Sequence, residues 1–208
     1  MAVNNFEKIS RLLKFESEHD FYFIQIIRRP KENPGLTEGK GNRTRCVKSY
    51  YIYSKEQLES HKNEIIKLCE MFNARAYIKM NYCDASKIAL HMIKEVSDYI
   101  LSGNLRGIKR CYDSCCGKYS GSDKDRKYWI IDLDGDEVQC AQEVINIINN
   151  KCKPEGDKFV ETIPTKNGVH LITRPFDKQE FSLLGCSLPS YVGGEDIKKE
   201  ALTILYCI

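Results

Sequence analysis

The 208-residue sequence lacks the features that would place it in a membrane or outside the cell. No apolar run approaches the length of a membrane-spanning helix, and the N-terminus has no signal-peptide pattern. A large excess of one charge is also absent, because 32 lysines and arginines are balanced by 29 aspartates and glutamates, a net charge of +3. We therefore expect a cytoplasmic globular protein with no membrane partner. Its mildly basic character permits a nucleic-acid partner but does not require one.

Cysteine is abundant, but the pattern of a zinc site is incomplete. The ten cysteines are spread through segments with helix and strand patterns, and without an export signal this favours reduced thiols. Cys111 and Cys115 could form one pair of zinc ligands, but no second C-x-x-C pair or histidine pair follows them. We therefore expect these cysteines to be structural.

The apolar pattern of the first hundred residues predicts an α/β lobe. Ser54 and Gln57 form a capping box at the start of a helix that Asn73 can end in a left-handed turn, and Asp84 caps a second long helix. The expected order is helix, strand, strand, helix, strand, helix, with the first helix at residues 5–15 and the strands at 21–27, 47–53 and 74–80.

A long basic connection joins the first two of these strands. Its several glycines and prolines are typical of a solvated loop. It could also lie over a phosphate backbone, and the candidate nucleic-acid-binding residues are Arg28, Arg29, Arg43 and Arg45. Both interpretations stay open at this point.

The stretch YWIIDLDGD, residues 128–136, is the most informative part of the sequence. Its apolar half predicts a buried strand, and alternation along a strand turns Asp132 and Asp134 to one face and Leu133 to the core. Two carboxylates this close repel each other in a partly desolvated site, and a bound Mg²⁺ or Mn²⁺ ion would keep both ionised. The alternative is a strand end that simply turns into solvent.

A helix and a β-hairpin are expected after the aspartate strand. Asn167-Gly168 is a strong turn signal, and His170 on the return strand faces away from its apolar neighbours. The turn also carries Lys166 and free backbone N–H groups, which can bind a phosphate. A polar segment at 102–127 precedes the aspartate strand. The helix after that strand is expected to end near residue 150, and the hairpin strands are expected at 158–163 and 169–173. A last strand is expected at 197–208.

Together, YWIIDLDGD, the helix and FVETIPTKNGVHLIT resemble the catalytic core of archaeo-eukaryotic-type primases, most closely the bacterial, plasmid and phage primase–polymerase branch. That family combines a strand ending in D-x-D or D-x-E with a later strand that carries a histidine, commonly in an s-x-H motif. Asp132 and Asp134 match the first motif, and Thr165 to His170 match the second. Gly168 departs from it, because a small hydroxyl residue often stands there.

The resemblance also calls for a third acidic residue on another strand. Asp196 is our choice, with Asp177 and Glu195 as alternatives, and this is the weakest of the three matches. The resemblance covers mainly residues 128–208. The first lobe would correspond to the variable N-terminal module of the family.

The resemblance implies an α+β fold with a primase–polymerase-like, two-lobed core. Residues 1–208 would form one domain, with an N-terminal αβ module at 1–110 packed on a catalytic metal-binding module at 120–208 whose RRM-like sheet contains the D-x-D and histidine strands. The implied function is template-dependent nucleotide transfer by a DNA primase or primase–polymerase. The implied partners are nucleoside triphosphates, a single-stranded DNA template and, in a larger assembly, a replicative helicase.

The site roles follow from the same resemblance. Asp132, Asp134 and Asp196 would hold two divalent ions, Mg²⁺ or Mn²⁺, that bridge the triphosphate and the attacking hydroxyl. His170 would bind a phosphate of the incoming nucleotide. Lys166, Asn167 and Arg174 would assist it.

Two other functions stay open. A catalytically degenerate, primase-like module could bind nucleic acid in a replication system, for example that of a phage or mobile element. Asp132 to Gly135 also resembles the first motif of haloacid-dehalogenase-type phosphatases, in which the first aspartate is the nucleophile. In the phosphatase Lys166 should approach Asp132 and His170 should have no role, whereas in the primase the acids should converge opposite His170.

Overall fold

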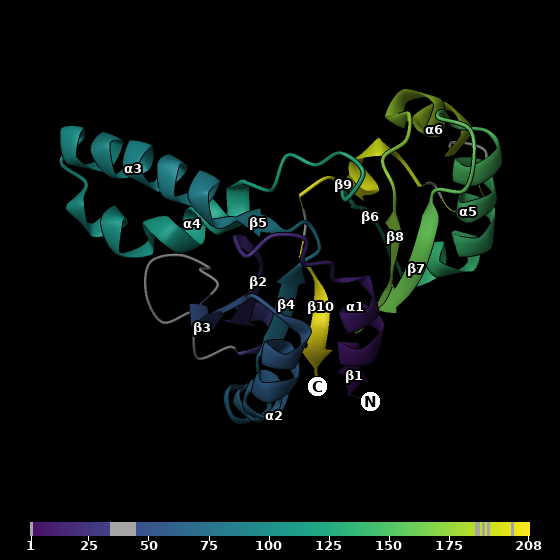
Figure 1. The fold of residues 1–208 in the computed structure, drawn as a ribbon. Coiled ribbons are helices and arrows are strands. Elements are labelled where there is room, and N and C mark those ends of the chain that lie inside the picture. The colour runs from purple at the N-terminus through teal and green to yellow at the C-terminus, as the bar shows by residue number, and fades with distance from the viewer. Residues whose placement is uncertain (1, 34–44, 186–187, 189, 191, 201) are drawn as a thin grey trace.

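A computed structural model shows an α+β fold with two antiparallel sheets and six α-helices in the part of the chain it describes. The structure describes residues 2–33, 45–185, 188, 190, 192–200 and 202–208. Figure 1 shows the second sheet with its helices on one side of the molecule and helices α3 (Ala85–Leu101) and α4 (Cys111–Lys118) on the other. No helix among the described residues is long and apolar enough to cross a membrane.

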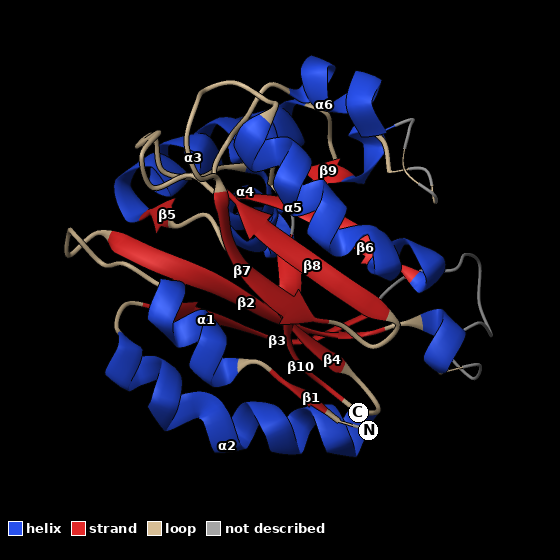
Figure 2. Ribbon diagram, turned by 90° about the vertical axis from the view of Figure 1, so that its right-hand side faces the viewer, coloured by secondary structure: helices blue, strands red, loops and turns tan. Residues whose placement is uncertain are grey.

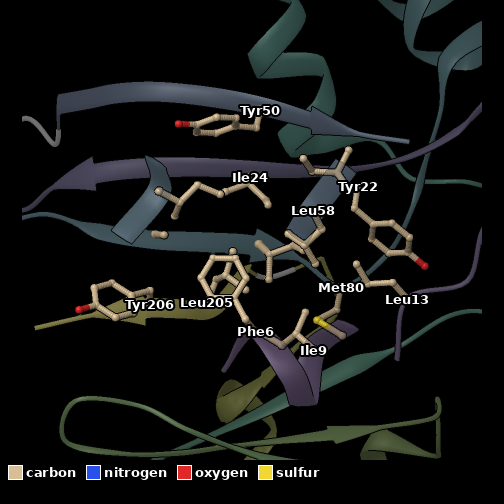
Figure 3. Close-up of a cluster of buried hydrophobic side chains, with 14 of the residues drawn as sticks. Phe6, Ile9, Leu13, Tyr22, Ile24, Tyr50, Leu58, Met80, Leu205 and Tyr206 are labelled. Carbon is tan, nitrogen blue, oxygen red and sulfur yellow. The ribbon is translucent and has the colours of Figure 1, made fainter. Parts of the chain in front are cut away.

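The first sheet has the strand order β1-β10-β4-β2-β3, and a short strand, β5, pairs with β2. Its strands are β1 (Val3–Asn4), β2 (Asp20–Arg28), β3 (Arg45–Ile52), β4 (Arg75–Lys79), β5 (Cys83–Asp84) and β10 (Leu202–Cys207). Two helices pack against one face of it, α1 (Phe6–Leu12) and α2 (Lys55–Phe72), and Figure 3 shows their side chains Phe6, Ile9 and Leu58 in one cluster with Ile24 of β2. This apolar cluster is the largest core of the protein.

The second sheet is built from the order β-α-β-β-α-β. Its parts are β6 (Trp129–Asp134), α5 (Ala141–Asn150), β7 (Phe159–Pro164), β8 (Gly168–Thr173), α6 (Lys178–Gly185) and β9 (Ile197–Lys198), and its strand order is β7-β8-β6-β9. Helices α5 and α6 cover its outer face (Figure 2). Ile131 and Leu133 of β6 are fully buried with Val144 and Phe181 of these helices.

The helix caps predicted from the sequence are confirmed. The Ser54 hydroxyl accepts a hydrogen bond from the Gln57 backbone N–H at 3.2 Å, and the Asp84 carboxylate accepts one from the Lys87 N–H at 3.0 Å at the start of α3 (Ala85–Leu101). Asn73 ends α2 in the left-handed conformation with a φ of 44°. These caps depend on residues within four positions of each other, so the sequence alone reveals them.

The expectation of a polar separating segment at residues 102–127 is wrong in its middle part. The chain there forms a 3₁₀ helix (Leu105–Arg110) and α4 (Cys111–Lys118). Cys111, Cys115 and Cys116 of α4 are buried in a core with Phe21 and Phe23 of β2. Reduced cysteines behave as small apolar residues, and three of them give α4 its buried face.

The predicted division at residues 110–120 is also corrected, because the last strand belongs to the first sheet. The segment expected as one strand at 197–208 forms two strands, β9 in the second sheet and β10 in the first, between β1 and β4. Ile204 and Leu205, neighbours along β10, are 2% and 0% exposed, so both faces of β10 are covered. The chain therefore crosses between the sheets just before β10, at the edge of the site described next.

Candidate active site

The two aspartates and the histidine lie on neighbouring strands of the second sheet. Strands β6 and β8 are antiparallel, with Asp132 opposite His170 and Asp134 opposite Gly168. Because Ile131 and Leu133 are buried under α5 and α6, Asp132 and Asp134 point to the opposite face, as predicted from alternation. The sequence therefore placed these two carboxylates correctly.

His170 connects the two sheets. Its Nε2 lies 3.1 Å from Oδ1 of Asp132, and its Nδ1 lies 2.8 Å from the hydroxyl of Thr203, a fully buried residue on β10. The hydrogen bond from His170 holds the pKa of Asp132 below its ordinary value, although partial burial opposes this. Both ring nitrogens are thus engaged, and His170 orients the Asp132 carboxylate.

A cleft of about 840 Å³ lies between the sheets and contains these residues. Asp132, Asp134 and His170 line it from the second sheet, and the first sheet contributes Arg75 and Tyr77 of β4. This volume is in the range of small-molecule sites, which typically measure about 300–1,000 Å³. The cleft can therefore hold a ligand of nucleotide size with a carboxylate pair on one wall.

Basic residues form the opposite wall of the cleft. Arg29 follows β2, Lys31 lies in the next 3₁₀ turn (Pro30–Glu32), and Arg75 projects from β4. Glu32 pairs with Arg75 through two hydrogen bonds, one of them 3.1 Å from Nε to Oε2. Burial raises the pKa of Glu32, but the hydrogen bonds from Arg75 outweigh this effect and hold the pKa below its ordinary value. The wall therefore remains cationic but carries one internal ion pair.

Of the three arginines proposed for nucleic acid that have a described position, only one lines this cleft. Arg29 does so, whereas Arg28 donates to the Asn33 side chain at 3.0 Å and is paired in register with Arg45 at the end of β2 and β3. Arg43 lies outside the described residues. Lys31 and Arg75 also line the cleft, but they were not predicted as site residues. A single lysine in a loop and a single arginine in a short strand belong to no recognisable sequence motif.

The hairpin turn lies partly at the cleft. Thr165 and Asn167 line it, and the Lys166 ammonium lies 3.7 Å from Glu32 of the basic wall. Arg174, predicted as a nucleotide ligand, does not line the cleft. Its guanidinium donates to the Asp125 backbone carbonyl at 2.6 Å and lies over the Tyr128 ring. The reason is distance along β8, because Arg174 follows the end of the strand remote from the turn.

The structure does not bring Asp196 to the cleft. Its carboxylate accepts a hydrogen bond from the Gly193 N–H at 2.7 Å and closes the short 3₁₀ turn (Gly194–Asp196) before β9. Of the alternatives, Asp177 accepts hydrogen bonds from the first N–H groups of α6, and Glu195 does not line the cleft. Asp196 and Asp177 thus bind backbone N–H groups of their own turns. The prediction of a third metal ligand considered only strand positions and did not anticipate these local bonds.

Glu200 is a cleft residue that the sequence did not reveal. It lies between β9 and β10, its Oε1 is 2.9 Å from the Lys127 ammonium, and its Oε2 is 3.6 Å from the buried Lys79. Burial raises the pKa of Glu200, but hydrogen bonds from Ser120 and Lys127 outweigh this effect and hold the pKa below its ordinary value. No pattern marks this residue, because its place depends on the crossing of the chain between the sheets.

Two groups of side chains could hold a metal ion. Asp132 and Asp134 offer carboxylate oxygens in the cleft. Among the residues with a described position, Glu95, Cys111 and Cys115 are the one group of three or more histidine, cysteine or acidic ligands whose ligand atoms all lie within 4.8 Å of one another. This group adds Glu95 of α3 to the cysteine pair seen in the sequence. Glu95 is also bound by the Lys118 ammonium at 2.8 Å.

Acidification should destabilise the protein through the cleft carboxylates. The pKa values of Glu32, Asp132 and Glu200 are lowered in the folded chain, so their stabilising contribution is complete above the ordinary carboxyl pKa of about 4 and is lost as the pH falls below it. We expect Glu32→Gln to lower the free energy of unfolding by about 1.5–3 kcal/mol at pH 7, since it removes charged hydrogen bonds to Arg75, and by much less at pH 3. Urea denaturation at both pH values measures this difference.

The matched control is Glu59→Gln on α2. Glu59 is 70% exposed and pairs with Lys62 at the surface, so its replacement should change stability little at either pH. A cost of Glu32→Gln that stays the same at pH 3 and pH 7 would contradict the prediction.

We compared the chain with protein-family models, with curated proteins and with solved structures, and none of the three comparisons finds a significant match.

Proposed function

We propose that this chain is a template-dependent nucleotidyltransferase, a DNA primase or primase–polymerase. The observation that carries the proposal is the cleft, in which Asp132 and Asp134 line one wall and Arg29, Lys31 and Arg75 the other. A nucleoside triphosphate requires both kinds of wall, because its phosphates bind to cations and to metal ions that carboxylates hold.

The second sheet supports the same proposal. Its β-α-β-β-α-β order, with β6 and β8 as neighbours in the sheet, is the RRM-like arrangement that the resemblance to primase–polymerases implies. In it the D-x-D strand lies directly beside the histidine strand. The first sheet and its helices would correspond to the N-terminal module of that family.

The donor set fits a Mg²⁺ or Mn²⁺ ion held by Asp132 and Asp134. The Asp132 side chain is 38% exposed, and Asp134 is exposed, so both can exchange water for a ligand. Mg²⁺ commonly uses one or two carboxylates and completes its shell with water and substrate phosphates, so Asp196 is not needed for one such site. When bound, the ion would neutralise phosphate charge and lower the pKa of an attacking hydroxyl.

Residues of the chain itself would bind the triphosphate and position the metal-binding carboxylate. Arg29, Lys31 and Arg75 would bind the triphosphate, and Arg75 is kept in place by Glu32. His170 is better suited to positioning Asp132 than to binding phosphate, since its two ring nitrogens already contact Asp132 and Thr203. This differs from the role that the resemblance assigns to it.

One observation favours a catalytically degenerate, nucleic-acid-binding module as the second candidate. The two other carboxylates of the cleft, Glu32 and Glu200, are each paired with cations, so neither is free to complete a two-metal site. The phosphatase is disfavoured, because Lys166 approaches Glu32 and His170 pairs with Asp132. The all-antiparallel second sheet also differs from the parallel sheet that such phosphatases need.

The test is nucleotide incorporation on a single-stranded DNA template with Mg²⁺ or Mn²⁺. We expect metal-dependent extension that falls by on the order of 100-fold or more in Asp132→Asn plus Asp134→Asn, because the isosteric amides keep the shape but lose the charge that holds the ion. The matched control is Asp136→Asn plus Asp157→Asn, which removes two exposed carboxylates outside the cleft and should leave extension unchanged.

Two outcomes of this test would support a different function. Retained binding of single-stranded DNA with no synthesis under either metal would favour the degenerate module. Release of phosphate from a simple phosphomonoester, dependent on Asp132, would favour the phosphatase.

A further inference from the structure

We propose a second site, which binds a phosphate group, at the end of β6 opposite to the two aspartates. A pocket of about 720 Å³ lies there, and we call it the lysine pocket. Four basic side chains line it together with the indole of Trp129: Lys124, Lys127, Arg174 and Lys199. They come from three separate segments, before β6, after β8 and after β9, which only the folded sheet brings together.

The charge of the lysine pocket is largely uncompensated. Lys127 is neutralised by Glu200 at 2.9 Å, but Lys124, Arg174 and Lys199 have no carboxylate partner within 4.0 Å in the described part of the chain. Asp125 is the single acidic residue of the lining. Converging cations in a concave site attract an anion and raise its local concentration.

Trp129 adds an unused hydrogen-bond donor. The side chain is 9% exposed and lines the lysine pocket, and its Nε1 is buried without a partner among the described residues. The hydroxyl of Thr173, directly opposite on β8 and fully buried, has no described partner either. A buried polar group without a partner costs about 1–3 kcal/mol, so such groups in native proteins usually have a bound partner. Less than 1 Å² of the Trp129 Nε1 atom is exposed, so a phosphate oxygen could bond to the indole N–H only if neighbouring side chains of the pocket moved aside.

One ion pair connects the lysine pocket to the cleft. Lys127 lines the pocket, and its partner Glu200 lines the cleft, so the two sites are neighbours. The phosphate could belong to the backbone of a nucleic-acid strand that leaves the cleft, or to a small free phosphate compound. The site itself depends on the contacts above and does not require the proposed nucleotide transfer.

The experiment uses Trp129, the single tryptophan of the chain, as a fluorescent reporter in the pocket. The 208-residue chain is titrated, without metal, with a single-stranded oligothymidylate and separately with inorganic triphosphate. We expect a saturable fluorescence change that Lys124→Gln plus Lys199→Gln weakens by about tenfold in affinity. For the oligonucleotide, losing two phosphate contacts should lower the slope of log affinity against log salt by about 1.4.

Two controls separate this site from general charge and from catalysis. Lys67→Gln plus Lys151→Gln removes the same charge from two exposed lysines outside the pocket and should leave the affinity unchanged. Asp132→Asn, which tests the cleft, should leave the Trp129 signal intact, so that failure of nucleotide transfer and failure of this proposal are distinguishable.

The two ligands identify the source of the phosphate. Saturation by the oligonucleotide alone supports a nucleic-acid strand, and saturation by triphosphate that displaces the oligonucleotide supports a free phosphate compound. No saturable change with either ligand, or equal loss of affinity in both lysine pairs, overturns the proposal.

Discussion

Lys79→Ala is expected to lower the free energy of unfolding by about 3–5 kcal/mol, a large part of the stability of an ordinary domain. The Lys79 side chain on β4 is fully buried. Its ammonium donates to three backbone carbonyls at the end of α4: those of Cys116 at 2.9 Å, Gly117 at 3.3 Å and Tyr119 at 2.7 Å.

The expected cost has two physical sources. The carbonyls at the C-terminal end of a helix carry partial negative charge, and without Lys79 they would be buried with no donor. Glu200, 3.6 Å from the ammonium, would also lose one of its two cations. Alanine leaves a cavity as well, so Lys79→Met should recover part of the loss by filling it.

Urea denaturation measures the effect, with Lys118→Ala as the matched control. Lys118 also lies at the end of α4, but its side chain is 55% exposed and its bond to Glu95 is at the surface, so its replacement should cost less than about 1 kcal/mol. Equal costs for the two alanine variants would show that Lys79 does not hold α4 on the first sheet.

Gly168→Ala is expected to cost about 3 kcal/mol in stability and, under the proposed function, to lower nucleotide incorporation by about 100-fold. A Cβ atom at Gly168 would lie 1.9 Å from the Leu133 carbonyl oxygen and 2.9 Å from the Asp134 Cα atom. Both are backbone atoms of β6, so the two strands would have to separate where Asp134 enters the cleft. A serine or threonine at this position would meet the same backbone.

The control for this variant is Gly117→Ala in α4. A Cβ atom there meets nothing within 4 Å, so alanine should be neutral or should stabilise the helix by up to about 1 kcal/mol. Thermal unfolding is measured for both variants, and template extension for Gly168→Ala, because Gly117 itself lines the cleft. A Gly168→Ala protein with the stability and activity of the parent chain would show that the β6–β8 register is looser than the structure indicates.

Features that depend on near neighbours could be predicted from the sequence. The caps at Ser54 and Asp84 and the left-handed Asn73 involve backbone groups a few residues away. Alternation along β6 was enough to place Asp132 and Asp134 on one face, and the Asn167-Gly168 turn was enough to place His170 on the strand that returns beside it. These patterns are periodic or local, so they need no knowledge of the rest of the chain.

Features that depend on long-range contacts were decided only by the tertiary structure. The last strand crosses to the first sheet, which brings Glu200 to the cleft and Thr203 to His170, and Arg75 and Lys31 reach the same cleft from the other lobe. Asp196 and Arg174 do not line the cleft, because a turn and a distant strand end hold them elsewhere. The sequence by itself determined the strand that carries the carboxylates and the face on which they lie. The partners of those carboxylates depend on which strands pair, because pairing energy comes from burial and backbone hydrogen bonds that many apolar segments could satisfy equally well.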